Sequence, residues 1–190
     1  MSSPEKNAKL VEIVLYPDPV LTKKARAITP EEFKSGVADG WNLKDLTDRM
    51  IALMYEAEGV GLAAPQVGVS LRLFVSDNSE ERRTPQIFFN PVLTELGGTL
   101  EIEEGCLSLP DVRSVVKRYQ HLKITAQKLD GTEFSQEAQD LMSRICQHET
   151  DHLDGILFTQ KIGTAARFML RSKMTQLEEE YEFRQRRKKK

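Results

Sequence analysis

Cysteine and histidine are scarce in this chain of 190 residues, which has two cysteines and three histidines. Two cysteines cannot form the disulfide framework of a small secreted domain, so one disulfide, a metal or catalytic role, and burial remain as alternatives. No apolar run approaches the roughly 20 residues that cross a bilayer, and residues 1–10 lack the apolar core of a secretory signal. We therefore expect a cytoplasmic protein without a membrane segment.

Charge is unevenly distributed, although the net charge is only −2. Residues 184–190 contain six of the 27 basic side chains and no acid, which leaves 21 basic against 29 acidic side chains in residues 1–183. We expect one domain over residues 1–183 and a basic tail over residues 184–190. The default state of such a tail is a solvated, frayed end.

Hydrophobic periodicity predicts an α+β fold. Apolar residues recur at helical spacing over residues 43–58 after a plausible N-cap at Asn42, from about residue 138 to a stop at Gly155, and over about 164–183. A hairpin turn is expected at Asp130–Gly131. Alternating or short apolar runs predict strands at residues 71–75, 87–89, 100–102 and 122–126.

The segment His148-Glu149-Thr150-Asp151-His152 fits the pattern H-E-x-x-H. Four helical residues turn about 400°, so the two imidazoles share one face and can bind one cation. Glu149 lies between them in angle and can take a proton from a water on the metal. The alternative is a chance match on a charged helix. If the helix binds a metal, the predicted α+β fold has mostly antiparallel strands around a central metal-binding helix, with N-terminal and C-terminal helices.

A catalytic site of this kind needs a third protein ligand. The extended motif would place a histidine where the chain has Phe158, and residues 178–180 belong to a charged face. His121 lies within a strand pattern, and Cys146 points about 200° away from the first histidine of the motif. Cys106, in the Gly-flanked segment EGCLS, is the remaining candidate, with burial as a small apolar residue as its alternative.

The loop Gly59–Gly68 consists mostly of small residues and contains Gln66. Its glycines can be explained as a helix C-cap and a turn. Small residues also let a substrate backbone approach closely, and a side-chain amide can stabilise an oxyanion. No G-K-[ST] follows, which excludes a phosphate-binding loop.

Three segments together resemble the peptide deformylase family. They read GVGLAAPQ at Gly59–Gln66, EGCLS at Glu104–Ser108 and QHETDH at Gln147–His152, in the family's order and at similar intervals. Tyr16–Pro19 also resembles the family's start, so the likeness covers about residues 10–175. The resemblance implies one catalytic domain over residues 1–183 that hydrolyses the N-terminal formyl group of formyl-methionyl nascent peptides and releases formate.

The same resemblance implies the roles of individual residues. One divalent metal ion is bound by Cys106, His148 and His152, with ferrous iron favoured and zinc, nickel or cobalt as alternatives. Glu149 passes a proton from water to the leaving amine. The oxyanion is held by the Gln66 amide and the backbone N–H of Leu107. The implied substrate-binding residues are Val60, Gly61, Ile102, Glu104, Arg113, Leu141 and Ile145.

Arg144 departs from the family resemblance, and the polar segment 31–42 is not explained by it. Arg144 stands one turn before His148, where an apolar side chain suits a methionine pocket better, so it either pairs with a carboxylate or narrows the pocket. The polar segment 31–42, which contains Trp41, has no role that the sequence assigns.

Partners and rival functions follow from the same features. The basic tail offers a contact with ribosomal RNA as the alternative to a frayed end, and no membrane partner is expected. An endopeptidase would use the same helix. A non-enzymatic RNA-binding protein with a structural metal would need a fourth protein ligand, for which the sequence has no convincing candidate.

Overall fold

The computed structural model describes residue 8 and residues 11–188, so most of residues 1–10 and the last two residues of the tail lie outside it. After the 3-10 helix η2 (Pro19–Thr22), the polar segment 31–42 forms most of helix α1 (Pro30–Ser35) and the short hairpin of β1 (Val37–Ala38) and β2 (Trp41–Asn42). Thr29 and Glu32 form a capping box at the start of α1. The segment to which the sequence assigned no role therefore forms a short helix and a hairpin.

Helix α2 (Leu43–Glu56) confirms the first predicted helix to within two residues. The Asn42 side chain accepts a hydrogen bond from the backbone N–H of Asp45, as an N-cap does. One face is buried in the first core cluster, which contains Leu43, Leu46, Met50, Leu53 and Met54.

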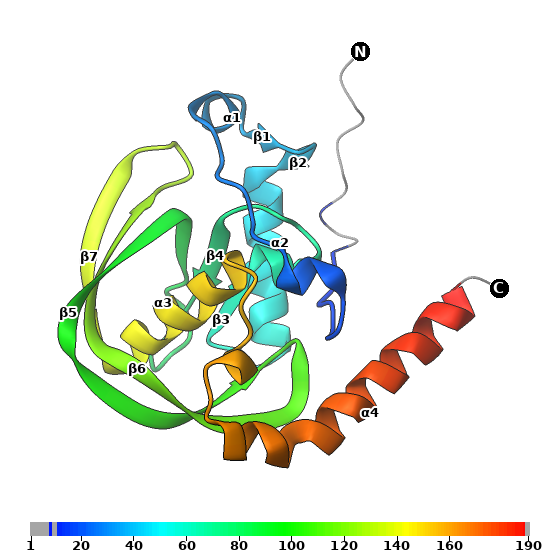
Figure 1. Ribbon diagram of the computed structural model, residues 1–190. Helices are drawn as coiled ribbons and strands as arrows, with labels where there is room; N and C mark the ends of the chain where they lie inside the picture. The colour runs from blue at the N-terminus through cyan, green and yellow to red at the C-terminus, as the bar shows by residue number, and fades with distance from the viewer. Residues whose placement is uncertain (1–7, 9–10, 189–190) are drawn as a thin grey trace.

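One five-stranded sheet carries most of the fold, in the order β3-β4-β5-β6-β7, and every pairing in it is antiparallel. Figure 1 shows the long strands curving around helix α3. This arrangement confirms the predicted α+β class. The strands are β3 (Gly61–Ala63), β4 (Leu73–Ser76), β5 (Gln86–Cys106), β6 (Leu109–Gln127) and β7 (Glu133–Gln139).

Two strand predictions differ from the structure. The separate strands expected at 87–89 and 100–102 are parts of the single strand β5, whose register against β6 shifts between Phe89 and Val92 and between Glu95 and Gly97. These shifts break the alternation from which a strand is recognised. The strand expected at 71–75 is present as β4, but it does not alternate, because all four of its residues are buried within the sheet.

Helix α3 (Asp140–Leu153) is the central helix, and it packs on the sheet through a second core cluster that includes Phe74, Phe88, Ile124 and Cys146. Cys146 is fully buried, so its position in the core is confirmed. Beyond α3 the chain turns at Gly155, which has φ +72°. A Cβ there would lie 2.7 Å from the Thr22 carbonyl oxygen, so the turn depends on glycine.

The final helix α4 (Thr164–Lys188) is five residues longer than predicted and includes most of the basic tail. A third core cluster holds it to the body through Leu177, and the Tyr16 hydroxyl donates to Glu178 at 2.7 Å. Figure 1 shows its C-terminal half extending away from the sheet. Within the described part of the chain, no helix is long and apolar enough to cross a membrane.

Candidate metal centre and active-site cleft

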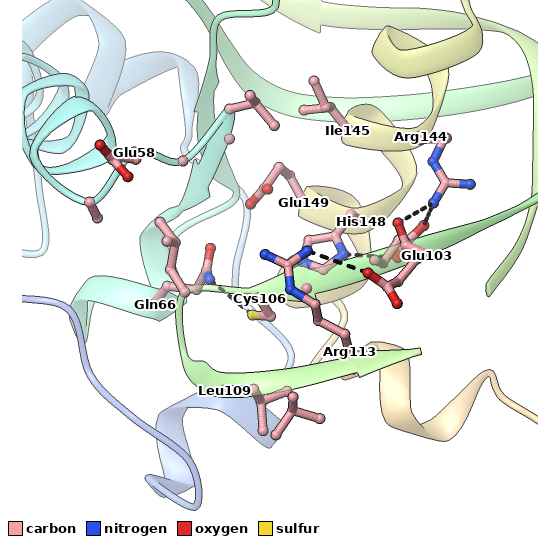
Figure 2. Close-up of a pocket in the computed structure, with 18 of the residues that line it drawn as sticks. Glu58, Gln66, Glu103, Cys106, Leu109, Arg113, Arg144, Ile145, His148 and Glu149 are labelled. Carbon is pink, nitrogen blue, oxygen red and sulfur yellow. Dashed lines mark hydrogen bonds and ion pairs between the residues drawn. The ribbon is translucent and has the colours of Figure 1, made fainter. Parts of the chain in front are cut away.

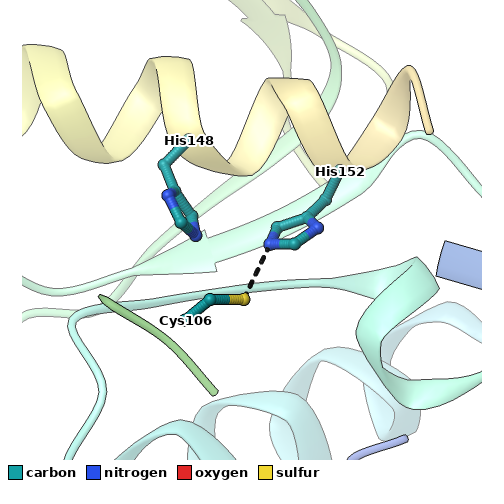
Figure 3. A group of neighbouring side chains, drawn as sticks. All are labelled: Cys106, His148 and His152. Carbon is teal, nitrogen blue, oxygen red and sulfur yellow. Dashed lines mark hydrogen bonds between the residues drawn. The ribbon is translucent and has the colours of Figure 1, made fainter. Parts of the chain in front are cut away.

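Helix α3 and the end of strand β5 bring together one sulfur and two imidazoles. The Cys106 Sγ lies 3.3 Å from the His152 Nε2, and potential ligand atoms of Cys106, His148 and His152 all lie within 4.8 Å of one another. Figure 3 shows the two rings on one face of α3, above the thiol. Tetrahedral bonds of about 2.0–2.3 Å would separate two such ligand atoms by about 3.3–3.7 Å. The 3.3 Å between the Cys106 Sγ and the His152 Nε2 matches that spacing.

The other ligands considered from the sequence lie elsewhere. His121 is in β6 and faces Glu137 at 3.0 Å, and Glu178 accepts the hydrogen bond from Tyr16. Phe158 stacks on the His148 ring with centroids 6.2 Å apart. No fourth histidine, cysteine or acid joins the cluster among the residues that the structure describes.

Glu104 fixes the orientation of the first imidazole. Its Oε2 lies 3.1 Å from the His148 Nδ1, which leaves Nε2 of that ring for a metal. Arg118 donates to both carboxylate oxygens of Glu104 at 3.0 Å. Burial alone would raise the pKa of Glu104, but hydrogen bonds from His148 and Arg118 outweigh it and lower the pKa to about 2. Glu104 is therefore an ionised group that orients His148, a candidate metal ligand.

Arg118 is the functional residue that sequence reasoning missed. It is 3% exposed and links Glu104 to Asp151, which also pairs with Lys161 at 2.7 Å. The signal was present in β6, where Val116, Arg118 and Leu122 share the inward parity of the strand. A cation among inward-facing apolar residues indicates a buried carboxylate partner.

Glu149 is buried beside the histidines, and its Oε2 has no hydrogen-bond partner among the described residues. Burial, which outweighs the attraction of the His148 charge, raises the pKa of Glu149 to about 7. A carboxylate with that pKa can both accept and return a proton at neutral pH. A Cβ on Gly61 would lie 2.9 Å from the Glu149 Cδ and closer still to Oε1, so glycine makes room for this side chain.

His152 is held in the form that binds metals. Burial, with repulsion from the charge of His148 as the next cause, lowers the pKa of His152 well below its usual value. The imidazole is therefore neutral at physiological pH, as ligation requires.

Gln66 presents its side-chain amide nitrogen to Cys106. Its Oε1 accepts a hydrogen bond from the Ala63 backbone N–H at 2.8 Å, which fixes the amide plane. Its Nε2 then lies 3.4 Å from both the Cys106 Sγ and the Ser108 Oγ. Leu107, the next residue after the thiol, also lines the cleft.

A cleft of about 440 Å³ opens onto these groups, and Figure 2 shows Gln66, Cys106, His148 and Glu149 around it. Ile102 does not line the cleft, and its side chain is 46% exposed. Arg113 stands at the mouth with a 68% exposed side chain, 3.7 Å from Glu103. The predicted substrate-binding residues that do line it are Val60, Gly61, Glu104, Arg113, Leu141 and Ile145.

Arg144 also lines the cleft. The sequence left open whether this side chain pairs with a carboxylate or narrows the pocket. Its Nη2 lies 3.1 Å from the Glu104 Oε1 and donates to the Ile102 carbonyl oxygen at 3.0 Å. The guanidinium thus pairs with a carboxylate while it forms part of the cleft wall.

Comparison with known proteins identifies the family of this chain. The family model described as polypeptide deformylase matches residues 10–168. The peptide deformylase of Acidobacterium capsulatum is 45% identical, and the match covers 82% of this chain and 88% of that protein. The crystal structure of the Thermus thermophilus peptide deformylase is 40% identical with a TM-score of 0.79, covering 90% of this chain and 99% of that one. The Plasmodium falciparum peptide deformylase is 35% identical with a TM-score of 0.81, covering 90% and 97%. The chain therefore belongs to the peptide deformylase family, the metal-dependent hydrolases that remove the N-formyl group from nascent peptides.

Proposed function

We propose that Cys106, His148 and His152 hold the one divalent metal ion of this deformylase and that Glu149 is its general base. The observation that carries the proposal is the cluster of one sulfur and two ring nitrogens within 4.8 Å of one another. A cysteine sulfur and two imidazole nitrogens are donors that suit zinc and iron. Among the described residues these three are the candidate ligands. A four-coordinate ion on them would keep one position for water or substrate.

Ferrous iron is the ion that we propose, on the strength of the resemblance in the three motifs, with zinc, nickel and cobalt as alternatives. The donor set does not discriminate among these ions, because occupancy depends on metal supply as well as on affinity. When bound, the ion acts as a Lewis acid and lowers the pKa of its water toward about 7.

The chain's own residues move the proton and bind the substrate. Glu149 accepts the proton of the attacking water and returns it to the leaving amine, which its pKa of about 7 favours. The Gln66 Nε2 and the Leu107 backbone N–H stabilise the oxyanion. Arg113 contacts the peptide chain at the mouth of the cleft. The wall of the pocket for the first side chain is formed by Val60, Gly61, Leu141 and Ile145.

The test is formate release from formyl-Met-Ala-Ser, measured anaerobically with added ferrous ion and again after a chelator. We expect Glu149→Gln to keep its metal and lose about 10²–10⁴-fold in kcat, while the exposed Glu179→Gln serves as the matched control. Cleavage of internal bonds of an unformylated peptide would instead support an endopeptidase. Full activity of the Glu149→Gln protein would contradict the proposed base.

We also propose that the protein acts in the cytoplasm and that residues 184–190 contact ribosomal RNA. The support is the six basic side chains of this segment, with no acid among them, at the end of a helix that extends from the body. Deletion of residues 184–190 is expected to weaken ribosome binding and its salt dependence, with unchanged activity on a short formyl-peptide. Equal ribosome affinity of the two proteins at low salt would rule this contact out.

A further inference from the structure

Arg144 interrupts the apolar wall that helix α3 contributes to the cleft. Leu141 and Ile145 line the cleft on either side of it, and His148 follows four residues later. Four helical residues rise about 6 Å along the axis. Arg144 therefore stands about one helical turn from the proposed metal centre, on the side where the first side chain of a substrate would enter.

The guanidinium of Arg144 is held in place, but not all of its N–H groups have a hydrogen-bond acceptor. Arg144 is 5% exposed, and its Nη2 is held by the Ile102 carbonyl oxygen and by Glu104. Its Nη1 is buried and has no hydrogen-bond partner among the described residues. A buried donor without an acceptor is costly, so a ligand that brings an acceptor gains more here than at a solvated arginine.

The charge of Arg144 is also only partly balanced. Glu104, its carboxylate partner, is shared with Arg118 and with His148. Burial lowers the pKa of Arg144, the attraction of Glu104 opposes this, and repulsion from Arg118 adds to the lowering. A guanidinium nevertheless stays protonated at neutral pH. The cleft wall therefore contains a charged donor that attracts an oxygen acceptor.

We propose that Arg144 is a specificity-determining residue that favours formyl-peptides whose first side chain ends in an oxygen acceptor, with methionine sulfoxide as the substrate nearest in shape to methionine. The inference rests on the proposed function, because it takes the formyl group to react beside Cys106, His148 and His152. From there, a side chain of methionine's length reaches about one helical turn along α3. A thioether sulfur accepts hydrogen bonds weakly, whereas the sulfoxide oxygen accepts them well.

The experiment compares kcat/KM for formyl-Met(O)-Ala-Ser and formyl-Met-Ala-Ser on the same metal-loaded preparation. The ratio of the two values cancels differences in folding or metal content between variants. We expect Arg144→Leu to lower the sulfoxide-to-methionine ratio about 10–100-fold, the range of a hydrogen bond to a charged donor. Arg171→Leu removes an equal charge from an exposed position of α4 outside the cleft, and its ratio is expected to match that of the parent protein.

The outcomes separate this inference from the function on which it rests. A ratio that Arg144→Leu leaves within about twofold of the parent value, or that Arg171→Leu lowers equally, overturns the role of Arg144. A parent protein that hydrolyses the methionine peptide but not the sulfoxide peptide also overturns it. Failure to release formate from either peptide with any divalent metal would instead count against the proposed function.

Discussion

Replacement of Gly61 with alanine tests how closely Glu149 is placed beside the metal ligands. A Cβ at position 61 would lie 2.9 Å from the Glu149 Cδ. Non-bonded carbon atoms prefer separations of about 3.5–4.0 Å, so the carboxylate must retreat by about 0.5–1 Å. Gly61 has no positive φ, so the backbone itself accepts alanine without strain.

The size of the effect follows from that displacement. Misplacement of a reacting group by about 1 Å costs about 10²-fold in rate. We therefore expect Gly61→Ala to lower kcat about 10–100-fold on formyl-Met-Ala-Ser at saturating substrate. The metal content should stay near that of the parent protein, because the three atoms nearest to the new methyl group all belong to Glu149.

The assay pairs formate release with metal analysis of the same samples. Gly163→Ala is the matched control, since a Cβ there meets no atom within 4 Å, and its kcat should equal that of the parent. A Gly61→Ala protein with undiminished kcat would refute the placement of Glu149. A loss of rate that follows a loss of metal in proportion would refute the reasoning as well.

Three further substitutions have expected outcomes. Gln66→Leu removes one proposed oxyanion donor and should lower kcat about 10²–10³-fold with metal retained, and a loss below tenfold would contradict that role. Arg118→Met leaves Glu104 and Asp151 without their shared partner. Urea unfolding should therefore show a loss of about 3 kcal/mol in the free energy of unfolding. An unchanged free energy of unfolding would show that the network is dispensable. Cys106→Ser should abolish stoichiometric metal binding while near-ultraviolet circular dichroism stays unchanged, and full metal occupancy would contradict the ligand set.

The sequence predicted the local parts of the site because local geometry determines them. Two histidines four residues apart on a helix share a face in any fold, and α3 carries His148 and His152 in that way. Helix α2 was predictable from its buried stripe and its cap at Asn42. The approach of Cys106 is a long-range contact. Elimination of the other ligands left Cys106 as a candidate with burial as its alternative, and the three motifs that resemble one family favoured the metal role.

What the sequence did not predict depends on pairing across the sheet. Glu104, a predicted substrate-binding residue, does line the cleft. The sequence did not predict that β5 and β6 also place it against Arg118, or that α3 places it against His148. No short motif contains these three residues together. The length of β5 was missed for a related reason, because its register shifts hide the alternation on which strand recognition depends.

The most direct measurement is a crystal structure of the protein loaded anaerobically with ferrous ion, with anomalous scattering recorded at the iron edge. Our account predicts one peak per chain, within bonding distance of the Cys106 Sγ, the His148 Nε2 and the His152 Nε2, and one further position filled by a non-protein ligand. A peak that lies away from any of these three atoms, or an ion enclosed by a fourth protein side chain, would contradict it.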